Sequence, residues 1–229
     1  MVVSRILKYI IAIAAAVFFL SALVVTGCGN SANSAATSQQ NVINFGKYEA
    51  GVYTNDFFNL KVKIPATWSV MNENDRMALM QKAGNIIAGN DKNMQSALNA
   101  QDFKNLVFLF ASESPVGAPV DFNPNFSIGA ENLAGSPGVK SGNDVLLDTK
   151  KLLGNSAVTA EFPTGIYQKE VGGLTFDVLD VTLTMGKKKI QEKLYATVRK
   201  RYALMFTLSY ERPQDLQKLE SILSDTSFS

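Results

Sequence analysis

The chain has 229 residues, with 22 basic and 20 acidic side chains, one cysteine and no histidine. The missing histidine excludes Ser-His-Asp triads, Cys-His pairs, H-E-x-x-H zinc sites and the usual general base at neutral pH. The single cysteine excludes an internal disulfide, and the chain lacks the basic excess that a nucleic-acid-binding protein normally carries.

The first 28 residues have the three parts of a secretory signal peptide. Arg5 and Lys8 form a positive front, residues 9–25 are apolar or small, and small residues then precede Cys28. The apolar run is at the lower limit of the roughly 17–25 residues that span a bilayer, so a plain transmembrane anchor is the alternative interpretation.

The end of this run resembles the lipobox of bacterial lipoproteins, in which an aliphatic residue, a small residue and Gly or Ala precede an invariant Cys. Val25, Thr26, Gly27 and Cys28 match it position by position. The resemblance implies cleavage before Cys28 and lipidation of its thiol. A buried core thiol is the alternative, but the glycines on both sides of Cys28 and the polar tract after it disfavour a core position.

The lipobox divides the chain into three predicted parts. Residues 1–27 form a lipoprotein signal peptide, residues 28–46 contain the lipidated cysteine and a flexible tether rich in Ser, Ala and Asn, and residues 47–229 form a folded domain. Removal of Arg5 and Lys8 leaves 20 basic against 20 acidic residues, so the pI of 8.5 describes the precursor. We expect a lipid-anchored protein on the extracytoplasmic face of a cell membrane, in a Gram-positive rather than a Gram-negative envelope.

The folded part begins with short elements. We expect a turn at residues 53–56, a half-buried strand over residues 58–64, and a helix that starts at the cap Asn72 and stops at Gly89. Asp91 is predicted to cap a second helix with Met94, Ala97 and Leu98. The methionines of this region are interpreted as core filler, with a ligand groove as the alternative.

The pattern of apolar residues from residue 106 onward predicts a sheet with two further helices. Residues 106–110 and 126–129 are expected strands, residues 134–143 a loop, and Asp144 the cap of a helix that ends at Gly154. Alternation around the turns Gly172-Gly173, Gly186 and Lys200-Arg201 predicts a four-stranded antiparallel meander from residue 166 to residue 210. Arg212 is the expected cap of a closing helix with Pro213 at its first position.

Three segments together resemble a PsbP-like domain, as found in many uncharacterised lipoproteins of Gram-positive bacteria. They are F-F-N-L-K-V-K-I-P-A-T-W, the late Y-A-L-M-F-T-L-S-Y, and the final L-E-S-I-L-S-D-T-S-F. The resemblance covers residues 48–228 and implies an α+β fold, a twisted and mainly antiparallel sheet with helices packed on it. PsbP is an extrinsic photosystem subunit in whose metal site histidines take part. Because this chain has no histidine, only the fold is carried over.

Seven cations are expected near the meander turns: Lys187, Lys188, Lys189, Lys193, Arg199, Lys200 and Arg201. Such a patch would bind anionic lipid or wall polymer, with about 1 kcal/mol per charge near an anionic surface. The alternative is a solvated turn with edge-strand lysines that discourage strand pairing.

The acids do not form a recognisable site. Asp177 and Asp180 lie in one expected strand with Glu170 across the hairpin, a set that could serve glycoside hydrolysis or hold calcium. An ideal strand points the two aspartates to opposite faces. No calcium loop or phosphate loop occurs, so we predict no catalytic residue, metal or cofactor, although a serine–lysine nucleophile is not excluded.

We therefore expect a non-catalytic binding or accessory module for a protein or envelope component, with no nucleic-acid partner. The alternative is a small-ligand carrier that uses the methionine-containing helices as a pocket. A cell-envelope hydrolase is third and would require a clustered carboxylate pair in a cleft.

Overall fold

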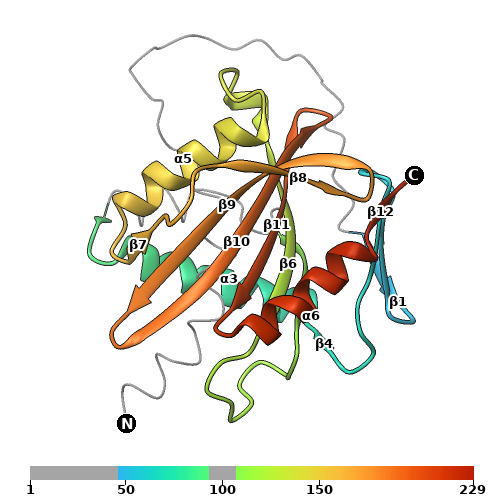
Figure 1. The fold of residues 1–229 in the computed structure, drawn as a ribbon, viewed down its shortest axis with the longest axis horizontal. Coiled ribbons are helices and arrows are strands. Elements are labelled where there is room, and N and C mark those ends of the chain that lie inside the picture. Colours follow the sequence, from blue (N-terminus) through green and yellow to red (C-terminus); the bar gives the residue numbers. More distant parts are fainter. Residues whose placement is uncertain (1–45, 93–106) are drawn as a thin grey trace.

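A computed structural model describes residues 46–92 and 107–229 of the chain (Figure 1). The predicted signal peptide, Cys28, nearly all of the tether and the second helix with Met94, Ala97 and Leu98 lie outside these residues. Within the described part, no helix is both long and apolar enough to cross a membrane.

The described elements follow one another along the chain in this order: β1 (Lys47–Glu49), β2 (Val52–Asn55), β3 (Leu60–Lys63), β4 (Ser69–Val70), α3 (Glu73–Ala88), β5 (Val107–Ser112), β6 (Asn125–Asn132), the 3-10 turn η4 (Leu133–Gly135), α5 (Gly142–Gly154), β7 (Thr159–Glu161), β8 (Tyr167–Val171), β9 (Leu174–Met185), β10 (Lys188–Arg199), β11 (Tyr202–Tyr210), α6 (Pro213–Ser224) and β12 (Ser227–Phe228).

These strands form two antiparallel sheets. The large sheet has the order β4-β5-β6-β11-β10-β9-β7, with β8 also paired to β9, and the small sheet has the order β1-β2-β3-β12. The predicted four-stranded meander is confirmed as β8-β9-β10-β11. The α+β class predicted from the sequence is confirmed by these pairings and by the helices on the sheet.

The predicted turns of the meander all occur. Gly172 and Gly173 both have positive φ, 59° and 82°, as a tight two-residue hairpin requires. The turn between β10 and β11 places two non-glycine residues, Lys200 and Arg201, at φ 50° and 65°. This left-handed conformation is unfavourable for residues with a Cβ. The long β10–β11 ladder on both sides of the turn stabilises it.

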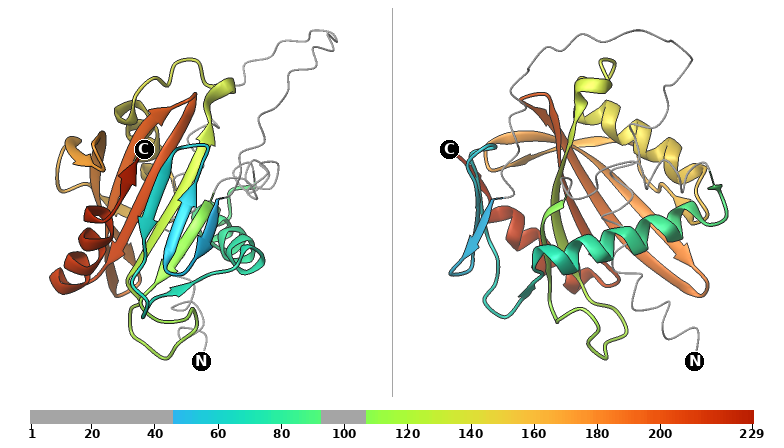
Figure 2. Two further views of the ribbon diagram at one scale, coloured as in Figure 1. Left: turned by 90° about the vertical axis from the view of Figure 1, so that its right-hand side faces the viewer. Right: turned by 180° about the vertical axis from the view of Figure 1, so that it is seen from behind.

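The large sheet separates two layers (Figure 2). Helices α3 and α5 cover one face, and α6 with the small sheet covers the other. Alternate residues of β9 point into two separate hydrophobic cores. Leu179 and Val181 pack in the core beneath α3 and α5, and Phe176 and Val178 pack in the core beneath α6 and the small sheet. The period of two along each strand therefore decides which layer a side chain meets.

Helices α3 and α6 start as predicted. The Asn72 side chain accepts a hydrogen bond from the Asp75 backbone N–H at 2.9 Å, and α3 ends before Gly89. At α6, Arg212 is the N-cap and Pro213 the first residue, and the Asp215 carboxylate accepts from the Arg212 backbone N–H at 3.2 Å and from its guanidinium at 2.8 Å. Leu219 and Leu223 of α6 are buried against the sheet.

Two predicted boundaries are wrong. Residues 53–56 are mostly strand, because the chain reverses earlier, at Ala50 and Gly51, which both have positive φ. Tyr53 is thereby buried in the small sheet.

Helix α5 begins at Gly142, with Ser141 rather than Asp144 as its N-cap. The Ser141 hydroxyl accepts from the Asp144 backbone N–H at 3.2 Å, and the Asp144 carboxylate accepts from the Ser141 backbone N–H at 3.0 Å. This reciprocal capping box satisfies two N–H groups at once, and it places Asp144 inside the first turn.

Candidate functional site

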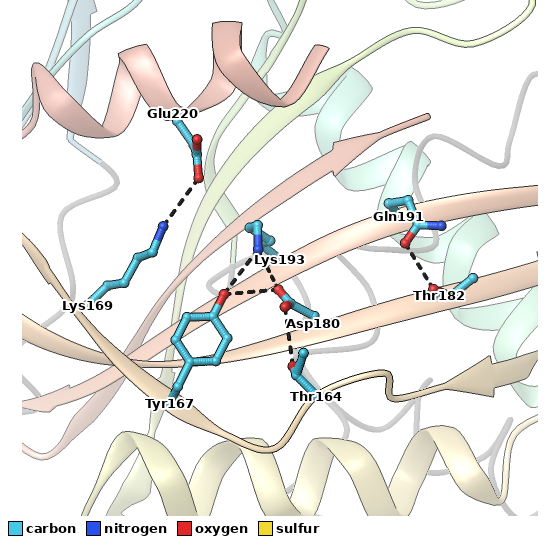
Figure 3. Close-up of polar contacts among 8 residues, drawn as sticks. All are labelled: Thr164, Tyr167, Lys169, Asp180, Thr182, Gln191, Lys193 and Glu220. Carbon is cyan, nitrogen blue, oxygen red and sulfur yellow. Dashed lines mark hydrogen bonds and ion pairs between the residues drawn. The ribbon is translucent and has the colours of Figure 1, made fainter. Parts of the chain in front are cut away.

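Polar side chains from β8, β9, β10 and α6 gather on the α6 face of the large sheet (Figure 3). The Lys193 ammonium donates to Asp180 Oδ1 at 2.7 Å and to the Tyr167 hydroxyl at 3.0 Å. The Tyr167 hydroxyl donates to the same Asp180 oxygen at 3.1 Å, and Thr164 donates to the other at 3.2 Å. We call these four residues the Lys193 cluster.

Strand register places the cluster. Lys193 on β10 is directly opposite Asp180 on β9, and Tyr167 on β8 is opposite Val178, two residues along β9 from Asp180. Cross-strand partners have Cβ atoms about 4.5–5.5 Å apart, close enough for a direct ion pair. The three strands therefore bring a carboxylate, an ammonium group and a phenol into direct contact.

The cluster is partly shielded from solvent, with Lys193 and Asp180 side chains 13% and 18% exposed. Burial lowers the pKa of Lys193, but the hydrogen bonds to Asp180 and Tyr167 raise it by more, so the net pKa lies above the ordinary value. Lys193 is therefore a permanent cation at physiological pH.

Further polar pairs border the cluster. Lys169 on β8 and Glu220 on α6 form an ion pair at 3.3 Å, which connects the hairpin to the helix. Thr182 donates to Gln191 at 2.9 Å on the neighbouring rung of the ladder. Burial raises the pKa of the nearby Tyr195 and Tyr210 phenols, so these groups remain neutral.

The structure does not bring the seven predicted cations into one patch. Lys187, Lys188 and Lys189 lie at one end of β10, and Arg199, Lys200 and Arg201 at the other. Eleven strand steps from Lys188 to Arg199 span roughly 36 Å at about 3.3 Å per residue. The length of β10 therefore separates the seven cations into two groups, and binding of these cations to an anionic surface stays a prediction.

Several of these cations are also neutralised. Lys188 lies 3.7 Å from Glu211, Lys189 lies 3.7 Å from Glu161, and Lys193 is paired with Asp180. At the far end, the Arg199 guanidinium lies over the Phe228 ring and the Lys200 ammonium over the Phe57 ring, with centroid distances of 5.3 Å and 5.1 Å. Most of these charges therefore support local packing.

The predicted acids are separated as expected for a strand. Asp180 joins the Lys193 cluster on the α6 face, whereas Asp177 points to the α5 face and accepts from the Asn143 backbone N–H at 2.8 Å. Asp177 thus anchors the N-terminal turn of α5, where a carboxylate is favoured. Glu170 is bonded to Thr175 across the hairpin. Among the described residues, no three His, Cys, Asp or Glu side chains are placed to hold a metal ion.

A cleft of about 510 Å³ lies beside α3. We call it the α3 cleft. Its lining combines polar and apolar side chains from the edge strand β4, the exposed side of α3, the end of β5 and the loop that follows it. The described residues that line it are Ser69, Val70, Met71, Asn72, Asp75, Ala78, Leu79, Lys82, Ser112, Pro115, Val116 and Gly117.

The sequence interpretation missed Glu192. This glutamate is 1% exposed on the face covered by α3 and α5, directly opposite Ser209 of β11. Burial raises its pKa to about 8, and Ser209 on the adjacent strand lowers it by less. The sequence does contain an indication of this burial. Glu192 lies between Ile190 and Leu194, at an inward-facing position of the alternating pattern of β10.

No protein-family model and no curated protein sequence matches this chain. Among solved structures, the chain is similar to the cyanobacterial PsbP protein CyanoP from Synechocystis sp. PCC 6803. The TM-score is 0.46 and the identity 12%, over 78% of this chain and 91% of that one. It is also similar to PA94 of Pseudomonas aeruginosa, a protein of unknown function, with a TM-score of 0.37 and 14% identity over 49% of this chain and 73% of that one.

Proposed function

We propose that this protein is a membrane-anchored extracytoplasmic lipoprotein whose folded domain is a non-catalytic binding or accessory module for a protein or envelope component. The lipobox Val25-Thr26-Gly27-Cys28 supports the anchor. Its first partner is then membrane lipid through Cys28, and stable anchoring requires more than one acyl chain. The tether of residues 29–46 lets the domain reach a partner near the membrane.

One observation supports the binding role above the others: the polar groups of the Lys193 cluster already satisfy one another. A nucleophilic or general-base lysine must lose its proton near neutral pH. Lys193 is held protonated by Asp180 and Tyr167, with its pKa above the ordinary value. The cluster therefore holds β8, β9 and β10 together and is unsuited to proton transfer, which supports a non-catalytic role for the domain.

The α3 cleft favours a second candidate, a small-ligand carrier. Its volume of about 510 Å³ lies within the range of about 300–1,000 Å³ typical of ligand pockets. The lining is mixed, with Met71 and Leu79 beside Ser69, Asp75 and Ser112, so it fits a polar ligand better than an apolar one. Asp75 is the one carboxylate among the described lining residues, which is too few for the acid pair of the hydrolase alternative.

Crosslinking in intact cells tests the proposed function. The full chain with a C-terminal tag is purified in mild detergent, and co-purifying proteins are identified by mass spectrometry. The control is the anchor with residues 47–229 deleted. We expect a stoichiometric partner or envelope fragment with the full chain that is lost from the control. Identical recovery from both would contradict a binding role for the domain.

A further inference from the structure

The small sheet β1-β2-β3-β12 presents one face to the large sheet and the other to solvent. Tyr53, Leu60 and Val62 point inward and are at most 2% exposed. The residues between them point outward, because side chains alternate along a strand, and no described element lies over this side of the sheet (Figure 2, left). We call this side the outer face, and its residues are Lys47, Glu49, Val52, Thr54, Lys61, Lys63 and Ser227.

The outer face carries a positive excess. Lys47 is neutralised by Glu49, with 2.7 Å between the ammonium nitrogen and the carboxylate oxygen. Lys61 and Lys63 on β3 are both exposed, and neither has an ion-pair partner among the described residues. The register pairs these two lysines with Thr54, Val52 and Ser227, so no acid on a neighbouring strand faces them. Two uncompensated cations therefore stand on an uncovered sheet face.

A second basic segment borders the outer face. The Lys200 ammonium donates to the Phe57 carbonyl oxygen at 2.5 Å, which holds the β10–β11 turn against the turn between β2 and β3. Lys200 and Arg201 are both exposed, and Asp56 is the one acid of the β2–β3 turn. These two cations enlarge the positive surface at one end of the small sheet.

The proposed tether enters the domain at this same sheet. Lys47 begins β1, which is the edge strand of the small sheet. As a flexible coil, residues 29–46 would span roughly 23 Å on average. The domain itself has an expected radius of gyration of about 16 Å, so the tether is short relative to the body that it holds. The side of the domain that carries β1 therefore stays nearest to the membrane in which Cys28 is anchored.

We propose that the outer face docks on the anionic lipid headgroups of the membrane that carries the anchor, which orients the domain with its small sheet toward the bilayer. Each lysine near such a surface strengthens association about fivefold. The tether adds an effective concentration in the millimolar range, so a face of weak intrinsic affinity is still occupied. The inference rests on the proposed lipid anchor and deepens it by naming the surface that meets the membrane.

Acetylation of lysine side chains with an amine-reactive reagent, read residue by residue by mass spectrometry, tests this orientation. The lipidated full chain is reconstituted in vesicles of phosphatidylcholine, alone or mixed with anionic phosphatidylglycerol. We expect acetylation of Lys61 and Lys63 to slow at least about threefold in the anionic vesicles only, and to recover at high salt, which screens exposed charges. Lys140 and Lys151, exposed near the two ends of α5, should react equally fast in both vesicles.

Charge reversal on the outer face gives the matched variants, with Lys47 as the reporter. Combined Lys61→Glu and Lys63→Glu should make Lys47 react equally fast in both vesicle types, because the positive excess is gone. Combined Lys140→Glu and Lys151→Glu, which changes the same amount of charge near α5, should leave the slowing at Lys47 intact. Circular dichroism verifies the fold of each variant.

Equal acetylation of Lys61 and Lys63 in the two vesicle types would overturn the proposal, as would equal slowing at Lys140 and Lys151. Slowing by soluble polyglutamate but not by phosphatidylglycerol would assign the outer face to an anionic polymer and overturn the lipid assignment. A full chain that does not float with phosphatidylcholine vesicles would contradict the anchor, and the docked orientation with it. Flotation without slowing would overturn the docking alone and leave the anchor standing.

Discussion

Lys193 and Asp180 face each other across the β9–β10 ladder, with 2.7 Å between the ammonium nitrogen and Asp180 Oδ1. Both side chains are largely shielded, and Tyr167 bonds to both of them. The pair therefore connects three strands at one point. It positions the short strand β8, which pairs with β9 at the margin of the large sheet.

Breaking this pair should destabilise the domain. Asp180→Ala leaves the Lys193 ammonium with Tyr167 as its remaining partner in a poorly solvated position. We expect a loss of about 1–3 kcal/mol in the free energy of unfolding, between the values for exposed and fully buried ion pairs. Urea denaturation of Asp180→Ala, Lys193→Met and the double variant, combined in a double-mutant cycle, measures the coupling.

The exposed pair Lys47–Glu49 is the matched control, with side chains 69% and 64% exposed. Glu49→Ala should change the free energy of unfolding by less than about 1 kcal/mol. Equal losses at the two pairs would show that the shielding of the Lys193 cluster has no energetic effect.

Glu192 should make stability depend on pH. Its pKa of about 8 in the folded protein lies above the ordinary value of 4.5. The folded state therefore binds a proton that the unfolded state has lost, and the stabilisation is complete below about pH 4.5. It declines as the pH rises to about 8. Each pKa unit is worth about 1.4 kcal/mol, so the decline amounts to several kcal/mol.

Glu192→Gln removes this titration, and thermal unfolding between pH 5 and pH 9 should show it. Relative to the wild type, the variant should become progressively more stable as the pH rises. Glu170→Gln on the exposed hairpin should follow the wild-type curve. A constant difference between Glu192→Gln and the wild type at all pH values would mean that Glu192 is ionised in the folded protein.

Gly142 lets α5 approach the sheet. A Cβ at this first helical position would lie 2.0 Å from the Ala196 carbonyl oxygen on β10. Gly142→Ala must therefore push the helix away, with an expected loss of about 1–3 kcal/mol, as for other overpacked sites. Gly154 at the opposite end of α5 is the control, because its Cβ would meet nothing within 4 Å. Gly154→Ala should be neutral or slightly stabilising, and a similar loss in both variants would contradict the close approach.

Cys28 should carry the lipid. Cys28→Ala should abolish incorporation of a labelled fatty acid and move the protein from the membrane fraction to the medium, because no acyl chain remains to hold it. Ser31→Ala in the adjacent tether should behave as the wild type. The lipobox interpretation would be contradicted if mass spectrometry of the membrane-bound wild-type protein showed an unmodified Cys28.

The order of the late strands was predictable because its causes are local. Alternating side chains and the turns Gly172-Gly173 and Gly186 specify the meander within a few residues, as Asn72 and Pro213 specify the starts of their helices. The start of α5 was missed because Ser141 and Asp144 are both good caps, and the reciprocal bonds between them decide which one serves.

By itself, the sequence determined the absence of histidine chemistry and the α+β arrangement of a late meander with a closing helix, and it predicts the lipobox. Only the tertiary structure decided the candidate sites. The burial of Glu192 follows from the layer of α3 and α5 over the sheet, and the alignment of Asn125 with Ser209 pairs strands far apart in the chain. The α3 cleft forms where β4, α3 and the loop after β5 meet. Such features arise from contacts between distant segments, which a pattern with a period of two or 3.6 residues does not encode.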